Sequence, residues 1–345
     1  MSEPTHITGT HVHPSGSCSA SKCAGCPSAS TCSSAKSSGT ATSAAPSSSC
    51  KPSACSTCPS AATCGKKPSN SNSGPDPTLQ HIKNRLDPIE YKFVIVSGKG
   101  GVGKSTTAVH FAHYLADVLK IKTGILDVDI TGPSLPSLVG KVGHDVMPSA
   151  LGAVPVEVSE NLKVMSIGFM LEDTNSAIIW RGPRKSGFIK SVITDVDWSN
   201  TDALVIDTPP GTSDEHLTIV NYLRECGANG AVIVTTPQEV AMADVRKEID
   251  FCRRAGLPII GIVENMSGFV CPNCEETHQI FPKSGKGPEG MAEEYNIPYL
   301  GAIPLNPTIS MSCENGSTFV NTEGVAQRAF INVCENIMSE IKKEQ

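Results

Sequence analysis

The stretch Ser97-Gly98-Lys99-Gly100-Gly101-Val102-Gly103-Lys104-Ser105-Thr106 decides how this chain folds. It holds the pattern G-x-x-x-x-G-K-S between an apolar run and a helical pattern. Glycines are needed in such a loop because the backbone must curl around a phosphate and aim its N–H groups at the oxygens, at the positive end of a helix dipole. The stretch therefore predicts a nucleotide phosphate site built from a strand, a loop and a helix.

Two lysines of this loop have different expected roles. Lys104 should reach the β and γ phosphates of ATP, and the Ser105 hydroxyl should bind Mg²⁺. Lys99 is a second cation inside the loop, although spacing alone is equally consistent with a surface lysine that has no role. The residues predicted to bind nucleotide here are Gly98, Lys99, Gly100, Gly101, Val102, Gly103, Lys104, Ser105 and Thr106.

Short apolar runs alternate with helical patterns from Tyr91 onward. Continuous β-branched runs are typical of strands that are covered on both faces, and the alternation predicts a doubly wound α/β domain with a mostly parallel sheet. The expected strands are Phe93–Ser97, Gly124–Leu126, Leu162–Ile167, Ala203–Ile206, Ala231–Thr235, Ile259–Val263 and Leu300–Ile303. Apolar stripes predict a helix over Thr106–Leu119 and another that carries Phe330, Val333, Ile337 and Ile341.

Three carboxylates follow expected strands. Asp127 and Asp129 lie in Leu-Asp-Val-Asp, and Asp207 begins Asp-Thr-Pro-Pro-Gly. Acids at the carboxyl ends of parallel strands face the ligand crevice, where they can hold Mg²⁺ or its waters and orient an attacking water. The competing interpretation is that some of them only cap the following helix. Asn265 also follows a strand, and its amide can pair with the adenine edge or serve as a plain turn residue.

The first 80 residues differ sharply from the rest. They contain five Lys, one Glu and one Asp, which gives this segment a net charge of +3. Because the formal net charge of the whole chain is −6, the remaining residues carry −9. Ser, Ala, Thr, Gly and Pro dominate, and such a segment buries too little surface to offset its chain entropy, so we expect residues 1–80 to be a disordered arm before an ATPase domain over 81–345. Neither charge suggests a nucleic-acid partner.

Eight cysteines of the arm repeat one spacing, C-x4-C-x2-C-x5-C, twice with an offset of 32 residues. Thiolates in a segment without a core point to binding of a soft metal or cluster. The x4-x2 opening also resembles plant-type [2Fe–2S] spacing, and a zinc-storing arm is a further alternative. The candidate ligands are Cys18, Cys23, Cys26, Cys32, Cys50, Cys55, Cys58 and Cys64.

The sequence carries no sign of export or membrane insertion. No apolar run is long enough to cross a bilayer, and the N-terminus lacks the charged-then-apolar layout of a secretory signal. A mitochondrial presequence should be rich in arginine, whereas the first arginine of this chain is Arg85. We therefore expect a cytoplasmic protein without a membrane partner, in which clustered thiols hold metal more often than they form disulfides.

A second cysteine site, Cys271-Pro-Asn-Cys274, lies inside the ATPase domain. The pair supplies two thiolates, whereas zinc or a cluster normally takes four protein ligands, and a two-fold axis could bring two pairs together. A redox pair and a zinc site are the alternatives. The single cysteines are expected to be ordinary buried or partly buried thiols: Cys226, Cys252, Cys313 and Cys334.

Residues Lys99 to Ser105 match the pattern K-G-G-x-G-K-[ST] and resemble the deviant P-loop ATPases, the group that contains MinD and ParA. The resemblance implies that Lys99 crosses a dimer to the partner's nucleotide. It also implies that Asp127 and Asp207 belong to the metal shell, that Asp129 positions water, that Gly211 is a switch hinge at the γ phosphate, and that Asn265 meets adenine.

Over residues 81–345 the motifs SGKGGVGKST, DVDITGPSLP, WRGPRK, DTPPGTSDEH, ENMSGFVCPNC and GAIPLNP resemble the Mrp/NBP subfamily. This implies a labile [4Fe–4S] cluster between subunits at Cys271 and Cys274 and a firmer one on the arm, where the duplicated repeat raises the possibility of two. It also implies that ATP binding and hydrolysis govern cluster assembly and transfer to cytosolic and nuclear apoproteins. Implied partners are a second copy or an armless paralogue, recipient apoproteins and targeting factors. The arm departs from the subfamily in the short gap between its first cysteine, Cys18 or Cys50, and the next one, which leaves that first ligand in doubt.

The rival function is a ParA/MinD-like positioning ATPase with a zinc-binding arm, which would dimerise on DNA or membrane. A zinc protein with a vestigial ATP site is a third possibility. In the favoured hypothesis the dimer closes around two Mg·ATP, and nucleotide state is felt at the cluster because the cysteines follow Asn265 closely.

Overall fold

The computed structural model describes residues 77–130, 132–170, 182–271, 274, 276–283 and 285–344. The chain divides into the units Met1–Ser73 and Gly74–Gln345. The first unit lies outside the described residues, and the eight arm cysteines with it. All the described residues belong to the second unit.

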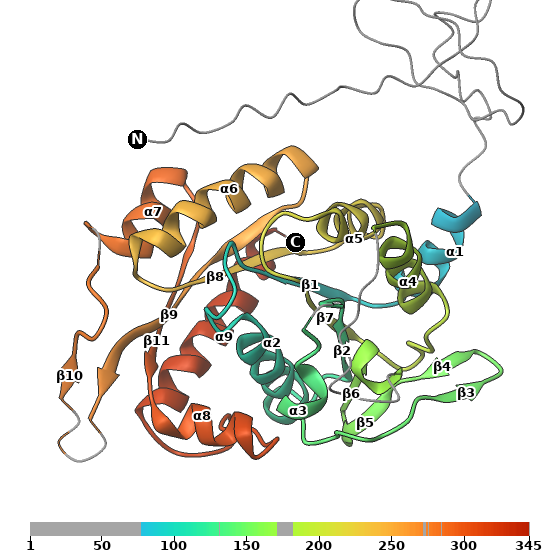
Figure 1. Cartoon of the computed structure of the whole chain (residues 1–345), viewed down its shortest axis with the longest axis horizontal. Coiled ribbons are helices and arrows are strands. Elements are labelled where there is room, and N and C mark those ends of the chain that lie inside the picture. The colour runs from blue at the N-terminus through green and yellow to red at the C-terminus, as the bar shows by residue number, and fades with distance from the viewer. Residues whose placement is uncertain are drawn as a thin grey trace, which may run out of the picture. The chain divides into compact units, whose positions relative to one another are not determined.

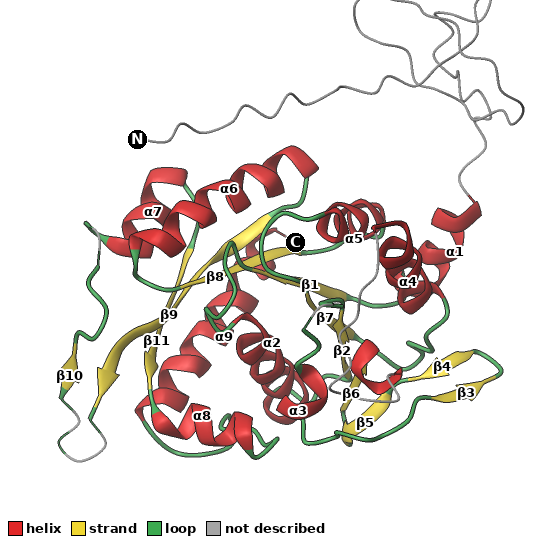
Figure 2. Ribbon diagram, in the orientation of Figure 1, coloured by secondary structure: helices red, strands yellow, loops and turns green. Residues whose placement is uncertain are grey.

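A nine-stranded, mostly parallel sheet forms the centre of the described domain (Figure 2). Its order is β10-β9-β8-β1-β7-β2-β6-β5, with β11 paired to β9. Within this sheet, only the β5–β6 and β9–β10 pairs are antiparallel. The strands are β1 Tyr91–Val96, β2 Thr123–Asp127, β5 Val156–Ser159, β6 Leu162–Ser166, β7 Ala203–Asp207, β8 Gly230–Thr235, β9 Ile259–Val270, β10 Thr277–His278 and β11 Tyr299–Leu305. A separate hairpin pairs β3 Met147–Ser149 with β4 Gly152–Val154.

Helices cover both faces of this sheet (Figure 1). They are α1 Pro77–Leu86, α2 Lys104–His113, α3 Leu135–Leu138, α4 Gly182–Thr194, α5 Asp214–Glu225, α6 Glu239–Ala255, α7 Gly287–Tyr295, α8 Pro307–Glu314 and α9 Val325–Glu344. No helix in these ranges combines the length and apolar character needed to cross a membrane.

Strand β1 shows why the sheet is buried on both sides. Phe93 and Ile95 belong to one core cluster, which includes residues of α2 and α9, whereas Val94 and Val96 belong to the other, with residues of α1, α4, α5 and α6. Successive side chains of a strand point to opposite faces, so a continuous apolar run serves both layers. The doubly wound α/β prediction is confirmed.

All seven predicted strands are present, and so is the last helix, whose four predicted stripe residues are buried. Two boundaries were wrong. The helix predicted to run to Leu119 is α-helical only to His113 and continues as a π-helix over Tyr114–Val118. The strand predicted to end at Val263 runs on to Val270, because β11 and β10 pair with its second half.

Glu248 of α6 is a buried acid whose two carboxylate oxygens make no hydrogen bond within the described part of the chain. Burial raises its pKa to about 8, so the side chain is largely protonated at neutral pH. The unfolded chain releases this proton at the ordinary pKa of 4.5.

We predict that Glu248→Gln removes a pH-dependent loss of stability. Between about pH 5 and pH 8 the folded wild type still holds a proton that the unfolded chain has lost, so its free energy of unfolding falls as the pH rises. Glutamine does not titrate, and the advantage of the variant over the wild type should grow across this window. Urea denaturation at several pH values measures it. The exposed Asp250→Asn on the same helix is the control, and parallel profiles for Glu248→Gln and wild type would contradict the prediction.

Candidate nucleotide and metal site

The phosphate loop connects β1 to α2, and close neighbours require glycine at two of its positions, Gly103 and Gly98. Gly103 has φ of 87°, a conformation that glycine adopts without steric cost, and a Cβ there would lie 2.1 Å from Nδ2 of Asn265. A Cβ on Gly98 would lie 2.5 Å from the carbonyl carbon of Asp244 in α6. The loop therefore packs closely against β9 and α6 at these two glycines.

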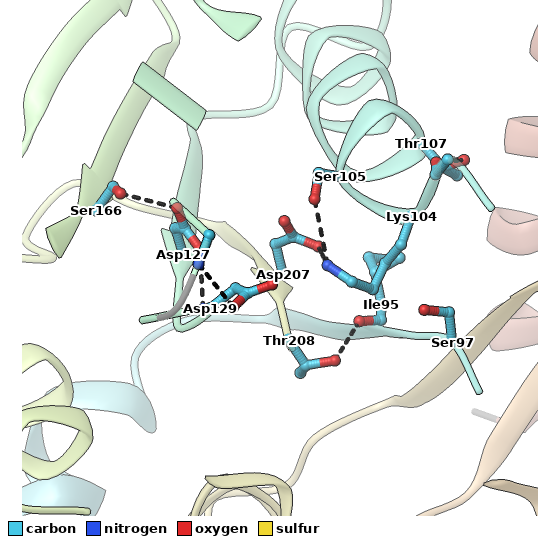
Figure 3. Close-up of polar contacts among 12 residues, drawn as sticks. Ile95, Ser97, Lys104, Ser105, Thr107, Asp127, Asp129, Ser166, Asp207 and Thr208 are labelled. Atoms are coloured by element: carbon cyan, nitrogen blue, oxygen red, sulfur yellow. Dashed lines mark hydrogen bonds and ion pairs between the residues drawn. The ribbon is translucent and has the colours of Figure 1, made fainter. Parts of the chain in front are cut away.

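Lys104 and Asp207 form an ion pair in the floor of this loop (Figure 3). Lys104 is 6% exposed and Asp207 is fully buried. The Lys104 ammonium also lies 3.2 Å from Oγ of Ser105. A buried ammonium needs an anionic partner, so in this arrangement Asp207 holds the position that a nucleotide phosphate can compete for.

Asp127 lies beside Asp207, because β2 and β7 pair in register at these two residues. Its Oδ2 accepts a hydrogen bond from the Ser166 hydroxyl at 2.8 Å, and its Oδ1 accepts one from the Asp129 amide at 3.0 Å. Burial, and then the charge of Asp207, raises the pKa of Asp127 to about 8. Burial also raises the pKa of Asp207, against the opposing effect of Lys104. Two buried carboxylates thus share one lysine.

The residues fit a bound Mg²⁺. Oδ2 of Asp207 is buried and has no hydrogen-bond partner among the described residues, which is a strong reason to expect a cation there. Asp207, Asp127 and Ser105 supply hard oxygen ligands of the kind that Mg²⁺ takes in nucleotide sites. Neither acid caps a helix here: α3 begins after Ser134 and α5 after Ser213. Asp129 is partly exposed at the same edge and accepts a hydrogen bond from Gly132 N at 3.3 Å.

The segment after β7 donates hydrogen bonds to backbone carbonyls of the phosphate loop and of β1. Gly211, at φ of 80°, donates its N–H to the carbonyl of Ser97 at 2.8 Å. Thr208 donates its hydroxyl to the carbonyl of Ile95 at 2.8 Å. The segment after β7 is therefore in direct contact with the phosphate loop, and the role of Gly211 as a switch hinge stays a prediction.

His216 is a part of this segment that the sequence analysis missed. It is fully buried, and burial followed by the charge of Lys104 lowers its pKa to about 4. Its Nδ1 accepts from the Ser213 amide at 3.4 Å, so the proton of the neutral ring lies on Nε2, which meets Oγ1 of Thr208 at 3.1 Å. The histidine thus holds the start of α5 against the residue that follows Asp207.

Asn265 lies inside β9 and contacts the loop from the other side. Its amide Nδ2 donates to the carbonyl of Val102 at 2.9 Å, and the residue is 9% exposed. The interpretation as a turn residue is wrong, because strand pairing with Ile303 continues through this position. Pairing of its amide with adenine stays a prediction. Lys99 is exposed, which leaves its ammonium free to extend from the loop.

Cys271 and Cys274 lie where β9 turns back into β10. Cys271 N donates to the carbonyl of Glu276 at 3.0 Å, and Val270 pairs with Thr277. Cys271 is partly exposed and Cys274 is exposed. The pair stands in a hairpin and does not open a helix, which argues against a thioredoxin-like redox site. No cluster of three or more Cys, His, Asp or Glu suited to a metal ion occurs among the residues described.

The remaining described cysteines behave as predicted: Cys226, Cys252 and Cys334 are buried, and Cys313 is partly buried. Cys313 lies near the phosphate loop, with its sulfur 3.9 Å from Oγ1 of Thr106 and 3.6 Å from Nε2 of His110. Burial raises the pKa of the Cys313 thiol, which keeps it protonated at neutral pH.

A glycine-rich loop between a parallel strand and a helix, with a buried lysine and two carboxylates at neighbouring strand ends, defines a P-loop nucleoside triphosphatase. Comparison with known proteins narrows this class. Residues 88–340 match the model of the ParA family described as "NUBPL iron-transfer P-loop NTPase". The chain belongs to this family.

Solved structures agree with the assignment. A nucleotide-binding protein from Archaeoglobus fulgidus, in complex with ADP, is 36% identical with a TM-score of 0.61, covering 72% of this chain and 98% of its own. The cell division ATPase MinD from Pyrococcus furiosus is 23% identical with a TM-score of 0.54, covering 73% and 99%. MinD from Pyrococcus horikoshii, complexed with Mg-ADP, is 23% identical with a TM-score of 0.51, covering 72% and 96%. The two MinD structures show a shared fold alone.

We predict that Asp207→Asn makes the folded protein dependent on nucleotide. The variant leaves Lys104 buried without its carboxylate and should lose about 3 kcal/mol of stability without nucleotide. ADP without Mg²⁺ should restore more stability than it adds to the wild type, and Mg²⁺ should add little. Thermal unfolding with and without ADP and Mg²⁺ measures this.

The control is Asp202→Asn, an exposed acid at the opposite end of β7. An unchanged melting temperature for Asp207→Asn without nucleotide, or a full Mg²⁺ effect, would contradict the assignment of Asp207.

Proposed function

We propose that this chain is an ATP-dependent scaffold that assembles iron–sulfur clusters and transfers them to apoproteins. One observation carries the proposal: β9 contacts the phosphate loop through Asn265 and leads directly into Cys271, so a single strand joins the nucleotide site to a cysteine pair. The family's description as iron-transfer NTPases supports an iron-containing cargo.

The nucleotide half of the mechanism rests on the loop and the two strand ends. The loop backbone binds the phosphates, and Lys104 moves from Asp207 to the β and γ phosphates. Ser105, Asp127 and Asp207 would hold Mg²⁺. When bound, Mg²⁺ neutralises charge on the phosphates. Asp129 orients the attacking water. The ADP complex of the Archaeoglobus relative supports an adenine nucleotide as ligand.

The cargo half rests on the hairpin. One chain presents two thiols, Cys271 and Cys274, and a [4Fe–4S] cluster takes four. Two chains related by a two-fold axis would supply them, and the exposure of Cys274 makes its sulfur available to a partner. The second chain is another copy or an armless paralogue. Lys99, exposed in the loop, would reach the partner's nucleotide in the closed dimer.

The arm adds eight cysteines in two repeats, and we assign it one or two further clusters of [4Fe–4S] type. In this scheme the protein is cytoplasmic, receives help from targeting factors and delivers clusters to recipient apoproteins. ATP binding closes the dimer, and hydrolysis changes the geometry of the shared thiols, which releases the cargo.

We predict that Cys271→Ala/Cys274→Ala loses the bridging cluster. After anaerobic reconstitution with iron and sulfide, the variant should contain about four fewer iron atoms per two chains than the wild type, since it lacks the shared thiols. Iron and acid-labile sulfide analysis on the dimer peak measures this, with Cys313→Ala as the control.

Unchanged iron per dimer in the double variant would contradict the bridging assignment. Co-sedimentation of the wild type with DNA or vesicles only when ATP is present would instead favour the positioning ATPase.

We predict that Lys99→Ala separates hydrolysis from binding. If Lys99 acts on the partner's nucleotide, its loss should lower the rate of ATP hydrolysis at least about a hundredfold, as for cationic groups supplied in trans, while ADP affinity is kept. A phosphate-release assay and calorimetry measure the two. Lys122→Ala, an exposed lysine before β2, is the control. Wild-type hydrolysis by Lys99→Ala would contradict the role.

A further inference from the structure

Strand β9 changes its pairing between the nucleotide site and the cysteine hairpin. Asn265 pairs with Ile303 of β11, and the next pair joins Phe269 to Leu305. Between these two pairs β9 advances by four residues while β11 advances by two, so the register of the pairing shifts. Met266, directly after Asn265, has φ of 55°, a left-handed conformation that is uncommon for a residue with a side chain. A bulge thus interrupts β9 between Asn265, which contacts the phosphate loop, and the cysteines. Any displacement transmitted along β9 from the phosphate loop to the cysteines has to cross this bulge.

Glu264 precedes this bulge and is fully buried. The Tyr299 hydroxyl of β11 donates to its Oε2 at 2.9 Å, and the Lys283 ammonium lies 2.6 Å from its Oε1. Burial and the Glu264 carboxylate raise the pKa of Tyr299, so its hydroxyl stays a donor. Oε1 makes no hydrogen bond among the described residues, so the nearby Lys283 ammonium compensates the buried carboxylate through its charge. A buried carboxylate is costly without such partners, which favours keeping Lys283 and Tyr299 in place.

Lys283 belongs to the limb of chain that returns from the cysteine hairpin. Upstream in the same limb, the Gln279 side-chain amide donates to the carbonyl of Ser267, a residue of the bulge, at 3.3 Å. The Ser267 hydroxyl donates to the carbonyl of Ile303 at 3.2 Å. The returning limb therefore holds β9 on both sides of Met266, once at the bulge and once before it.

We propose that Glu264, Lys283 and Tyr299 are positioning residues that make the cysteine hairpin follow the nucleotide state of the phosphate loop. This inference rests on the proposed function. Nucleotide at the loop displaces Val102 and with it Asn265. The bulge alone would absorb that displacement, whereas the Lys283–Glu264 ion pair carries it past the bulge to the returning limb and to Cys274.

Cysteine reactivity tests the proposal without any cluster. The full-length, metal-free protein is treated with N-ethylmaleimide, with and without Mg²⁺ and a non-hydrolysable ATP analogue, and the alkylation rate of Cys274 is followed by peptide mass spectrometry. In the wild type, nucleotide should change this rate about fivefold or more. In Lys283→Met the rate should no longer depend on nucleotide, although affinity for the analogue is kept.

Three further variants separate positioning from folding. Lys283→Arg restores the charge and should restore the nucleotide response. Glu264→Gln keeps the shape of the side chain and should lose the response as Lys283→Met does. Lys286→Met is the matched control, because this exposed lysine lies in the same limb but pairs with Glu293 of α7 at 2.7 Å. It should respond as the wild type does.

A wild-type response in both Lys283→Met and Glu264→Gln would overturn the proposal, as would a wild type whose Cys274 ignores nucleotide. Equal loss in Lys286→Met would overturn it too, since any change in the limb would then suffice. The proposed function fails separately, when Cys271→Ala/Cys274→Ala keeps all its iron. A Lys283-dependent response of Cys274 in a protein that binds no bridging cluster would uphold the coupling and reject the cargo.

Discussion

The buried ion pair between Lys104 and Asp207 is the interaction on which the rest of the site depends. It places an ammonium at the start of α2 and a carboxylate at the end of β7, where neither could be buried alone. The pair also explains the neighbourhood. Burial and the charge of Asp207 raise the pKa of Asp127. Oδ2 of Asp207 has no hydrogen-bond partner among the described residues, which marks a place for a cation. A phosphate that takes Lys104 away from Asp207 would leave the two carboxylates without their cation, and a bound Mg²⁺ would replace it.

Around this pair, three separate parts of the chain contact the phosphate loop. Gly211 binds it from the segment after β7, Asn265 binds it from β9, and Asp244 of α6 packs on Gly98. Each contact is made to the backbone of the loop, so each depends on the loop's conformation and not on its side chains. This is a physical basis for relaying phosphate occupancy to both the α5 segment and the cysteine hairpin.

The doubly wound fold and much of the nucleotide site could be predicted from local sequence. The loop pattern, the carboxylates after apolar runs and the seven strands are all short-range signals, and the structure confirms the strands and brings Asp127 and Asp207 together. His216 and the Glu264–Lys283 pair could not be predicted. Nothing in their local pattern indicates burial, and their partners Thr208 and Tyr299 reach them only through tertiary packing.

Sequence by itself therefore determined the architecture, the phosphate loop and the existence of a cysteine pair, because spacing and hydrophobic period are properties of neighbouring residues. Tertiary structure decided that β9 runs past Asn265 to Val270, beside Cys271, and bulges at Met266. A strand's length and register depend on the edge it pairs with, and here β11 and β10 supply that edge from later parts of the chain.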